Sequence, residues 1–124
     1  MPNTEVRLFQ DEDGTVPLLD WLDQVPEKVC MKCTRAVARL SQLGFELHVG
    51  RRKEAAYLGN GLYELRVRHG SVNYRMLYFF YGKEAIVVTH GLQKERKVPN
   101  REINLALRRK RAYEENPERH TYLS

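Results

Sequence analysis

The stretch GLYELRVRHGSVNYRMLYFF, residues 61–80, decides the fold because it predicts a β-hairpin. Apolar and polar residues alternate on both sides of the Gly-Ser dipeptide at 70–71, which is typical of a tight turn between antiparallel strands. Arg66, Arg68 and Arg75 lie in the middle of these strands, where a buried arginine is rare unless it is paired. Either these side chains have partners elsewhere in the chain, or they face a groove that suits an anion.

Further strands and helices are expected on both sides of the hairpin. The expected strands are residues 5–10, 62–69, 72–81 and 84–92, and the expected helices are residues 17–25, 27–43 and 100–111. Residues 45–60 are expected to form a basic loop. Thr15 and Asn100 are candidate caps, and Gly44 is a natural helix stop.

These elements predict an α+β fold within a single domain, residues 1–124. A helical hairpin would pack on a small, mainly antiparallel sheet, and a further helix would follow the sheet. Residues 114–124 are polar and contain a proline, so they are expected to fray. The place of the first strand in the sheet does not follow from the pattern.

Composition narrows the class of protein. The chain has 124 residues, of which 42% are hydrophobic and 30% charged, as in a globular domain with one core rather than a disordered chain. No apolar run approaches the roughly 18 residues that a membrane span needs. The N-terminal residues also lack the basic-then-apolar pattern of a signal peptide. We therefore expect a cytoplasmic protein with no membrane partner.

Charge is distributed unevenly along the chain. Residues 1–50 carry a net charge of −3 and residues 51–124 a net charge of +8, and the basic part contains the hairpin. A one-sided positive field favours a polyanion such as nucleic acid as partner, although a solvated basic surface has the same composition.

The two cysteines form the motif CMKC, at Cys30 and Cys33. A zinc site would need two further ligands, and the sequence offers no second cysteine pair and no closely spaced histidine pair. Cys30, Cys33, Val37 and Leu40 recur at helical spacing, so both thiols are expected to pack as small hydrophobic groups.

The register of the strands places the arginines on one face. With a two-residue turn at 70–71, Arg66 lies opposite Arg75. With a two-residue turn at 82–83, Arg75 lies opposite His90, whereas a three-residue turn shifts the pairing by one. One face, expected to be covered by the helical hairpin, then carries Tyr63, Leu65, Val67, Tyr74, Met76, Tyr78, Phe80, Val87 and Thr89. The other face carries an apolar end, Leu77, Phe79, Ile86 and Val88, and a cationic end, Arg66, Arg68, Asn73, Arg75 and His90.

Two directly opposed arginines repel each other, which costs up to about 1 kcal/mol. A bound anion would remove this repulsion, and so would an ion-pair network in which Glu64 neutralises Arg66 and Arg75. Both explanations remain open from the sequence.

A row of Arg and His has the groups that cleavage of RNA requires. The 2′-hydroxyl of RNA can attack the adjacent 3′-phosphate, and the protein must then align the attack, move protons and stabilise charge. Arginine suits the phosphate because its planar fork donates paired hydrogen bonds. Histidine suits proton transfer near neutral pH. Basic residues after the last strand would hold flanking phosphates.

The segment GLYELRVRHGSVNYRMLYFFYGKEAIVVTHGLQKERKVP resembles the core of the HigB-like toxins, including their phage-derived branch, within the RelE/ParE superfamily. The matching features are the GLYELR strand, the YR strand with its aromatic tail, and the strand that ends in HG before a Lys-rich loop. The resemblance extends over about residues 5–112. It implies a type II toxin that cleaves mRNA, usually on the ribosome and without metal, and that a helix-turn-helix antitoxin neutralises.

The resemblance also implies a site. The predicted catalytic residues are Arg66, Arg75, His90 and Lys94. The predicted RNA-binding residues are Arg51, Arg52, Arg68, Asn73, Arg96 and Lys97. No metal ligand and no cofactor is predicted, and the superfamily varies its catalytic residues, so the general acid and base are not assigned. The ParE side of the superfamily targets DNA gyrase, so a non-enzymatic toxin and an RNA-binding module without cleavage remain alternatives.

Overall fold

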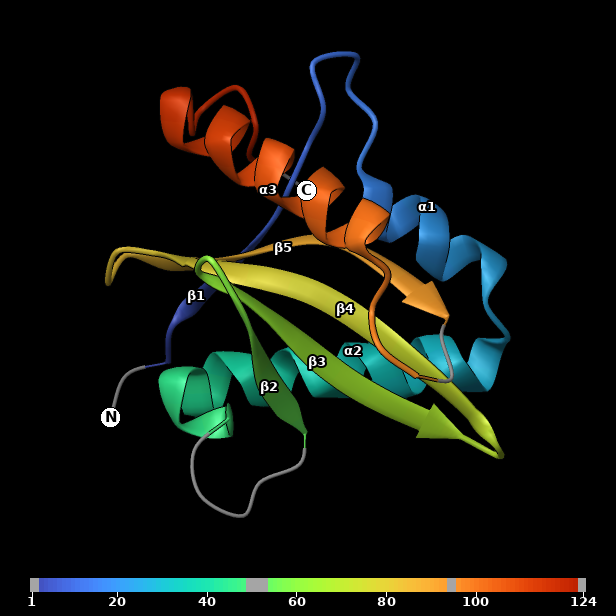
Figure 1. The fold of residues 1–124 in the computed structure, drawn as a ribbon. Coiled ribbons are helices and arrows are strands. Elements are labelled where there is room, and N and C mark those ends of the chain that lie inside the picture. Colours follow the sequence, from blue (N-terminus) through green and yellow to red (C-terminus); the bar gives the residue numbers. More distant parts are fainter. Residues whose placement is uncertain (1–2, 49–53, 94–95, 123–124) are drawn as a thin grey trace.

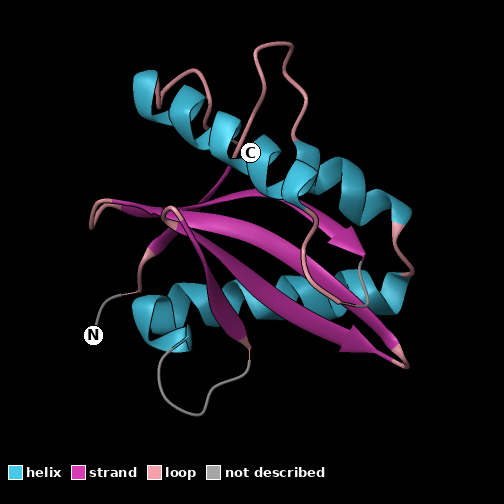
Figure 2. Cartoon of the chain, viewed as in Figure 1, coloured by secondary structure: helices cyan, strands magenta, loops and turns pink. Residues whose placement is uncertain are grey.

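The computed structural model describes residues 3–48, 54–93 and 96–122, and these form three α-helices around one five-stranded mixed sheet (Figures 1 and 2). The strands are β1 (Glu5–Leu8), β2 (Ala55–Gly59), β3 (Leu62–His69), β4 (Val72–Tyr81) and β5 (Ala85–Gln93). The helices are α1 (Pro17–Gln24), α2 (Glu27–Leu43) and α3 (Asn100–Glu115), with a short 3-10 helix, η1 (Gly44–His48), after α2. The predicted α+β class is confirmed.

The strand order across the sheet is β1-β5-β4-β3-β2. β2 to β5 form a continuous antiparallel meander, while β1 lies at the edge and pairs with β5 in parallel. The sequence pattern gave the first strand no position. Its parallel pairing follows from the chain between β1 and β5, which carries helices and strands and is long enough to return to the same end of the sheet.

Two apolar cores lie on opposite faces of the sheet. α1 and α2 cover one face, where Cys33 and Leu40 pack with Met76 and Tyr78. α3 covers the other face, where Ala106 and other apolar residues pack on the sheet. Figure 1 shows α2 and α3 on opposite sides of the strands. The sheet is therefore buried on both faces, and polar groups on it need partners or an opening.

The β3–β4 hairpin has the predicted register, with Arg66 opposite Arg75 and His69 opposite Val72. The β4–β5 pairing differs from the two-residue prediction. Tyr81 pairs with Ala85, so the turn has three residues, and an irregularity between Leu77 and Tyr78 shifts the pairing once more.

The shifted pairing changes what each face of β5 carries. Arg75 lies opposite Leu92 rather than His90, which pairs with Leu77. Ile86 and Val88 belong to the core under α1 and α2, and Val87 belongs to the core under α3. The predicted faces of these β5 residues were therefore wrong, because the third residue of the turn shifts the register by one and so moves each of these side chains to the other face.

Residues 55–59 form strand β2, which the sequence analysis assigned to a loop. Asn60 and Gly61 connect β2 to β3, and both have positive φ, 54° and 82°. An Asn-Gly pair with this geometry is typical of a two-residue hairpin turn. The signal was therefore present in the sequence, beside a strand of only five residues.

The predicted frayed tail is also wrong as far as the described residues reach. α3 continues to Glu115, and the following segment returns to β1. Phe9 and Thr121 form a β-bridge, and the N–H of Tyr122 donates to the carbonyl of Leu8 at 2.9 Å. Residues 116–122 thus line the outer edge of the sheet.

Neither of the two predicted N-cap residues, Thr15 and Asn100, occupies an N-cap position. Val16 and Pro99 occupy the N-cap positions of α1 and α3, and neither makes a side-chain cap. The hydroxyl of Thr15 donates to the carboxylate of Asp13 instead. None of the helices in the described ranges is both long and apolar enough to cross a membrane.

Candidate functional site

A cleft of about 490 Å³ opens on the α3 side of the sheet, next to β2. β3 and β4 form its floor, and the segment between β5 and α3 and the first turn of α3 form its wall. The charged and amide side chains that line it are Glu64, Arg66, Arg75, Arg96, Lys97 and Asn100. The structure therefore brings together four of the predicted site residues, Arg66, Arg75, Arg96 and Lys97.

Glu64 is the centre of this cleft. Its side chain is 2% exposed, and its two carboxylate oxygens each accept a hydrogen bond at 2.8 Å, one from Nε of Arg66 and one from an amino group of Arg75. Each of these bonds is charge-assisted, which makes it stronger than a neutral one. The ion-pair network that the sequence left open is present, and it holds the two opposed guanidinium groups in fixed positions.

The two arginines differ in access to solvent. The side chain of Arg66 is 45% exposed, and that of Arg75 is 13% exposed. Nε of Arg75 is buried and has no hydrogen-bond partner among the described residues. A buried donor without a partner is costly. Arg75 therefore has one donor that neither Glu64 nor any other described residue satisfies.

Positive charge exceeds negative charge at the cleft. Four cationic side chains and one carboxylate line it, so one carboxylate does not neutralise the site. Arg96 and Lys97 are exposed and lie between β5 and α3. They extend the positive surface from the floor of the cleft to its mouth, where flanking phosphates of a polyanion would lie.

His90 lies outside the lining of this cleft. It is 5% exposed and packs in the layer between β5 and α3, with its Nε2 3.7 Å from a carboxylate oxygen of Glu102. Burial and, to a smaller degree, the nearby positive charge of Arg109 lower the pKa of His90 to about 4. The side chain is therefore neutral at neutral pH. It shares the sheet face of Arg75 but not its cross-strand row.

The remaining predicted residues are placed as follows. Arg68 is exposed, and its Nε donates to the carbonyl of Gly70 at the hairpin turn. Asn73 lies opposite Arg68 on β4. Both are beyond the cleft, towards the tip of the hairpin. Arg51, Arg52 and Lys94 lie outside the described residues.

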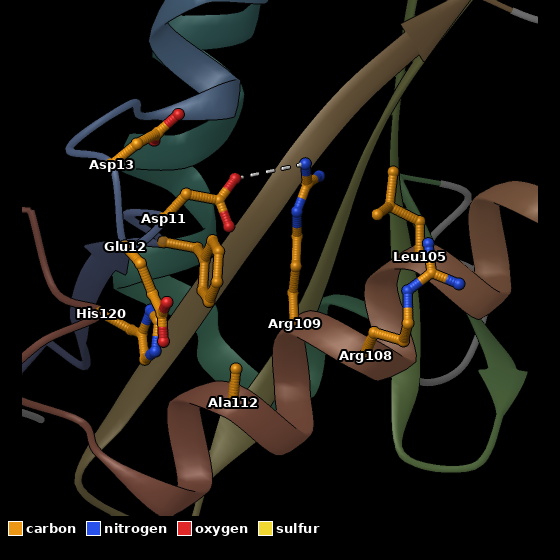
Figure 3. A pocket seen from close by; sticks show the side chains of 9 residues that line it. Asp11, Glu12, Asp13, Leu105, Arg108, Arg109, Ala112 and His120 are labelled. Carbon is orange, nitrogen blue, oxygen red and sulfur yellow. Dashed lines mark ion pairs between the residues drawn. The ribbon is translucent and has the colours of Figure 1, made fainter.

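A second cleft, of about 470 Å³, lies on the other side of α3 (Figure 3). Arg109 reaches across it to Asp11, with 3.7 Å between the nearest charged atoms, and its guanidinium lies over the ring of Phe9. His120 stacks on the same ring, and its Nδ1 is 2.7 Å from the carbonyl oxygen of Gln10. These contacts connect α3 to the segment that follows β1, and one ion pair, between Arg109 and Asp11, spans the cleft.

Of the two cysteines, Cys33 packs in the core as predicted, while Cys30 is not part of that core. Cys33 is fully buried in the core under α2, and Cys30 is half-buried beside it. Burial raises the pKa of Cys33 to about 11. The thiol therefore stays protonated and unreactive at neutral pH. Across the described residues, no three His, Cys, Asp or Glu side chains are grouped so that they could hold a metal ion.

The sequence predicted only some of the role of Glu64. Its two-residue spacing from Arg66 gave the shared face, but its burial follows from β2, which pairs Ala56 with Glu64 and was not expected. Asn100 was read as a cap and lines the cleft instead.

Comparison with known proteins gives one family. The model described as Phage derived protein Gp49-like (DUF891) matches residues 20–111, about three quarters of the chain. The match begins in α1, includes α2 and strands β2 to β5, and ends in α3. It contains the whole lining of the cationic cleft. A search of curated proteins finds no match.

Proposed function

The chain belongs to the Gp49-like family of phage-derived proteins, and from this premise we propose that it is a type II toxin that cleaves mRNA. The family is a RelE/HigB-like toxin family, consistent with a toxin of a toxin–antitoxin system and with a cognate antitoxin as partner. The mixed sheet with its three helices is compatible with a RelE-like fold. The observation that carries the nuclease proposal is the cationic cleft around Arg66 and Arg75.

The chemistry begins with the 2′-hydroxyl of one ribose. Its oxygen attacks the adjacent phosphorus, the bond from phosphorus to the 5′-oxygen breaks, and a 2′,3′-cyclic phosphate and a 5′-hydroxyl result. The proton of the 2′-hydroxyl passes to water and one proton reaches the 5′-oxygen, so the overall charge is conserved. The enzyme has to position the phosphate and stabilise charge on its oxygens, which guanidinium groups do without a metal.

The described residues suggest a division of roles. Arg75 and Arg66 would contact the non-bridging oxygens of the scissile phosphate, with Glu64 holding both guanidinium groups in place. Arg96 and Lys97 would contact flanking phosphates. Lys97 would also act as the proton donor to the leaving 5′-oxygen. We assign His90 to the support of α3, because it is buried outside the lining of the cleft.

The partners follow from the same proposal. The substrate would be mRNA. Its cleavage can be assayed both on the ribosome and with free mRNA. The antitoxin would be a small helix-turn-helix protein, as the resemblance to HigB-like toxins implies. DNA would bind in the cleft but would not be cut, since it lacks the 2′-hydroxyl.

Mapping of RNA 5′ ends tests the nuclease. Cells expressing the wild type should contain mRNA with new 5′-hydroxyl ends, and cells expressing Arg75→Ala should lack them, a loss of at least about 100-fold. Arg75→Lys should restore little cleavage, because an ammonium group lacks the planar fork. Arg35→Ala is the matched control, since Arg35 is exposed on α2 at the opposite face of the sheet.

Equal cleavage by Arg75→Ala and wild type would refute the role of Arg75. Absence of cleavage by the wild type, with translation inhibited, would refute the nuclease itself. Circular dichroism of each purified variant separates loss of chemistry from loss of fold.

A non-enzymatic toxin that binds a protein target such as DNA gyrase is the second candidate. The observation in its favour is that Glu64 already pairs with both Arg66 and Arg75, so the two opposed guanidinium groups have a partner other than a bound phosphate. Such a toxin should cause DNA breaks while mRNA stays intact. The same 5′-end maps, read together with a DNA-damage reporter, distinguish the two candidates.

A further inference from the structure

Aromatic side chains gather at one end of the sheet, on the face that α1 and α2 cover. They are Phe45 of η1, Tyr63 of β3 and Phe80 of β4. The ring centroid of Phe80 lies 5.8 Å from that of Phe45 and 5.2 Å from that of Tyr63. These rings line a pocket of about 550 Å³, the aromatic pocket, together with Thr4, Gly82 and Lys83.

Packing of the core does not account for the exposure of these rings. Phe45 is 60% exposed, and Tyr57, whose ring centroid lies 4.9 Å from that of Tyr63, is 56% exposed. Among the described residues, the other large hydrophobic side chain with such exposure is Met31, at 50%. Apolar residues that are exposed singly are common, whereas rings grouped on one surface are typical of a binding site.

Hydrogen bonds hold two walls of the aromatic pocket together. The N–H of Thr4 donates to the carbonyl of Ser41 at 2.8 Å, and the hydroxyl of Ser41 donates to the carbonyl of Thr4 at 2.7 Å. Gly44, where α2 passes into η1, lies so close to Thr4 that a Cβ there would be 3.1 Å from its hydroxyl oxygen. The N-terminal segment and η1 are therefore already joined, and a partner does not have to order them.

The charge of the aromatic pocket differs from that of the two clefts described above. Each of those clefts has five charged side chains in its lining, whereas the aromatic pocket has one, the exposed Lys83. Three rings and one cation suit an apolar side chain that has carboxylates next to it. The net charge of the whole chain, +5, also favours an acidic partner.

We propose that the aromatic pocket anchors the cognate antitoxin through an apolar side chain within an acidic segment of that protein. A toxin–antitoxin family implies a protein partner of this chain. Protein partners are held mainly by a few large side chains that fill pockets on the other surface. An aromatic anchor would meet the rings of Phe45, Tyr63 and Phe80 edge-on or offset, the arrangements that aromatic groups prefer.

The proposal rests on the function proposed above and adds the place where the antitoxin is held. α2 and α3 lie on opposite sides of the sheet (Figure 1), with the aromatic pocket on the α2 side and the cationic cleft on the α3 side. The anchor and the scissile phosphate therefore do not compete for the same space. Substitutions in the aromatic pocket should weaken antitoxin binding and leave RNA cleavage intact, and Arg75→Ala should do the reverse.

Binding of the whole purified protein to the protein encoded next to it, purified separately, tests the proposal. Phe45→Ser should weaken binding at least about 30-fold, the loss that marks a residue at the centre of an interface. Lys83→Glu should weaken it at least about fivefold, chiefly through slower association, and by less at high salt. Biolayer interferometry at two salt concentrations measures the affinities and the rates.

Met31→Ser is the matched control, because Met31 is similarly exposed but does not line the aromatic pocket. It should bind the antitoxin as the wild type does. Equal weakening by Met31→Ser and Phe45→Ser would show a general effect of lost apolar surface and overturn the proposal. Unchanged binding in Phe45→Ser and Lys83→Glu would overturn it too, including the case in which Phe45→Ser alters self-association of the chain instead. Absence of binding by the wild type would also overturn it.

Two features of the experiment keep its outcome clear. Lys83 is exposed in the turn between β4 and β5, so Lys83→Glu tests the pocket even if circular dichroism shows that Phe45→Ser does not fold. The binding assay contains no RNA, so its outcome is separate from that of the 5′-end maps.

Discussion

At the scale of single residues, Glu64 explains how two arginines can be directly opposed within a sheet. Arg66 and Arg75 would repel each other, but the buried carboxylate between them bonds to both. A buried ion pair often adds little net stability, while removal of one partner is strongly destabilising. Glu64 therefore fixes the geometry of the cleft floor.

Replacement of Glu64 by glutamine tests this role. Glu64→Gln keeps the shape of the side chain and removes its charge, so we expect the free energy of unfolding to fall by about 3 kcal/mol. Inorganic phosphate should stabilise this variant more than the wild type, because both guanidinium groups are then free to bind it. Urea unfolding with and without phosphate measures both effects.

Glu54→Gln is the control for that experiment. Glu54 forms an ion pair with Arg39 at the surface, and an exposed pair of this kind contributes up to about 1 kcal/mol. If phosphate stabilises Glu64→Gln no more than it stabilises the control, Glu64 does not hold the arginines for an anion.

His90 gives the protein a predictable dependence on pH. Its pKa is about 4 when folded, lower than the ordinary value of 6.5, so the unfolded chain binds the proton more tightly. The stability that this residue contributes is present above pH 6.5 and is lost as the pH falls towards 4. Between about pH 7.5 and about pH 5, the free energy of unfolding should fall by about 2 kcal/mol from His90 alone.

Urea unfolding of the wild type and of His90→Gln at these two pH values measures the effect. Glutamine does not titrate, so the pH dependence should be smaller in the variant by that amount. The other charged groups that face His90, Glu102 and Arg109, are present in both proteins. An identical pH dependence in the two proteins would show that His90 is not buried as described.

At the scale of elements, the contact between α1 and β5 depends on a glycine. The ring of Trp21 lies so close to Gly91 that a Cβ at Gly91 would be 2.2 Å from a carbon of the indole. Trp21 also packs edge-on against Tyr74. The indole of Trp21 therefore helps to position α1 on the sheet, because it occupies the space that a side chain at position 91 would fill.

Gly91→Ala should displace Trp21 and loosen α1. Overpacking of this kind costs typically 1–3 kcal/mol, and we expect about 2 kcal/mol here. Trp21 is the sole tryptophan of the chain, so its fluorescence should shift to longer wavelength as the indole becomes exposed. In the background of Trp21→Leu the cost of Gly91→Ala should be smaller, and equal costs in the two backgrounds would contradict the contact.

The strands also show which part of the register could be predicted from the sequence. Gly70 and Ser71 form a turn of standard length, and the pairing of Arg66 with Arg75 followed from it. The turn at 82–84 has three residues, and Thr89 is the extra residue in β5 where the register shifts. Turn length and bulges depend on how strands twist and pack across the whole sheet, so local pattern did not reveal them. The prediction put His90 on the correct face but opposite Arg75, whereas it lies opposite Leu77, two residues further along β4.

At the scale of the whole molecule, the two faces of the sheet differ in what covers them. One face is covered by α1 and α2, and the other combines a second core with the cationic cleft. The sequence predicted the grouping of Arg66, Arg75, Arg96 and Lys97, since charge and strand alternation are local. The burial of Glu64 depends on β2, and the burial of His90 on α3 packed over β5. Both are tertiary effects, which a single sequence does not encode in its periodicity.

The return of residues 116–122 to β1 has a consequence for folding during synthesis. Nδ1 of His120 lies 2.7 Å from the carbonyl oxygen of Gln10, a contact between residues 110 positions apart in the sequence. β1 leaves the ribosome first, yet its parallel neighbour β5 and its outer partners at 120–122 are made much later. Closing loops of this length is slow, because chain entropy is lost before the contact is gained. A growing chain would therefore hold β1 unpaired until β5 had been made. The outer edge of the sheet would be completed only after residues 120–122 had emerged.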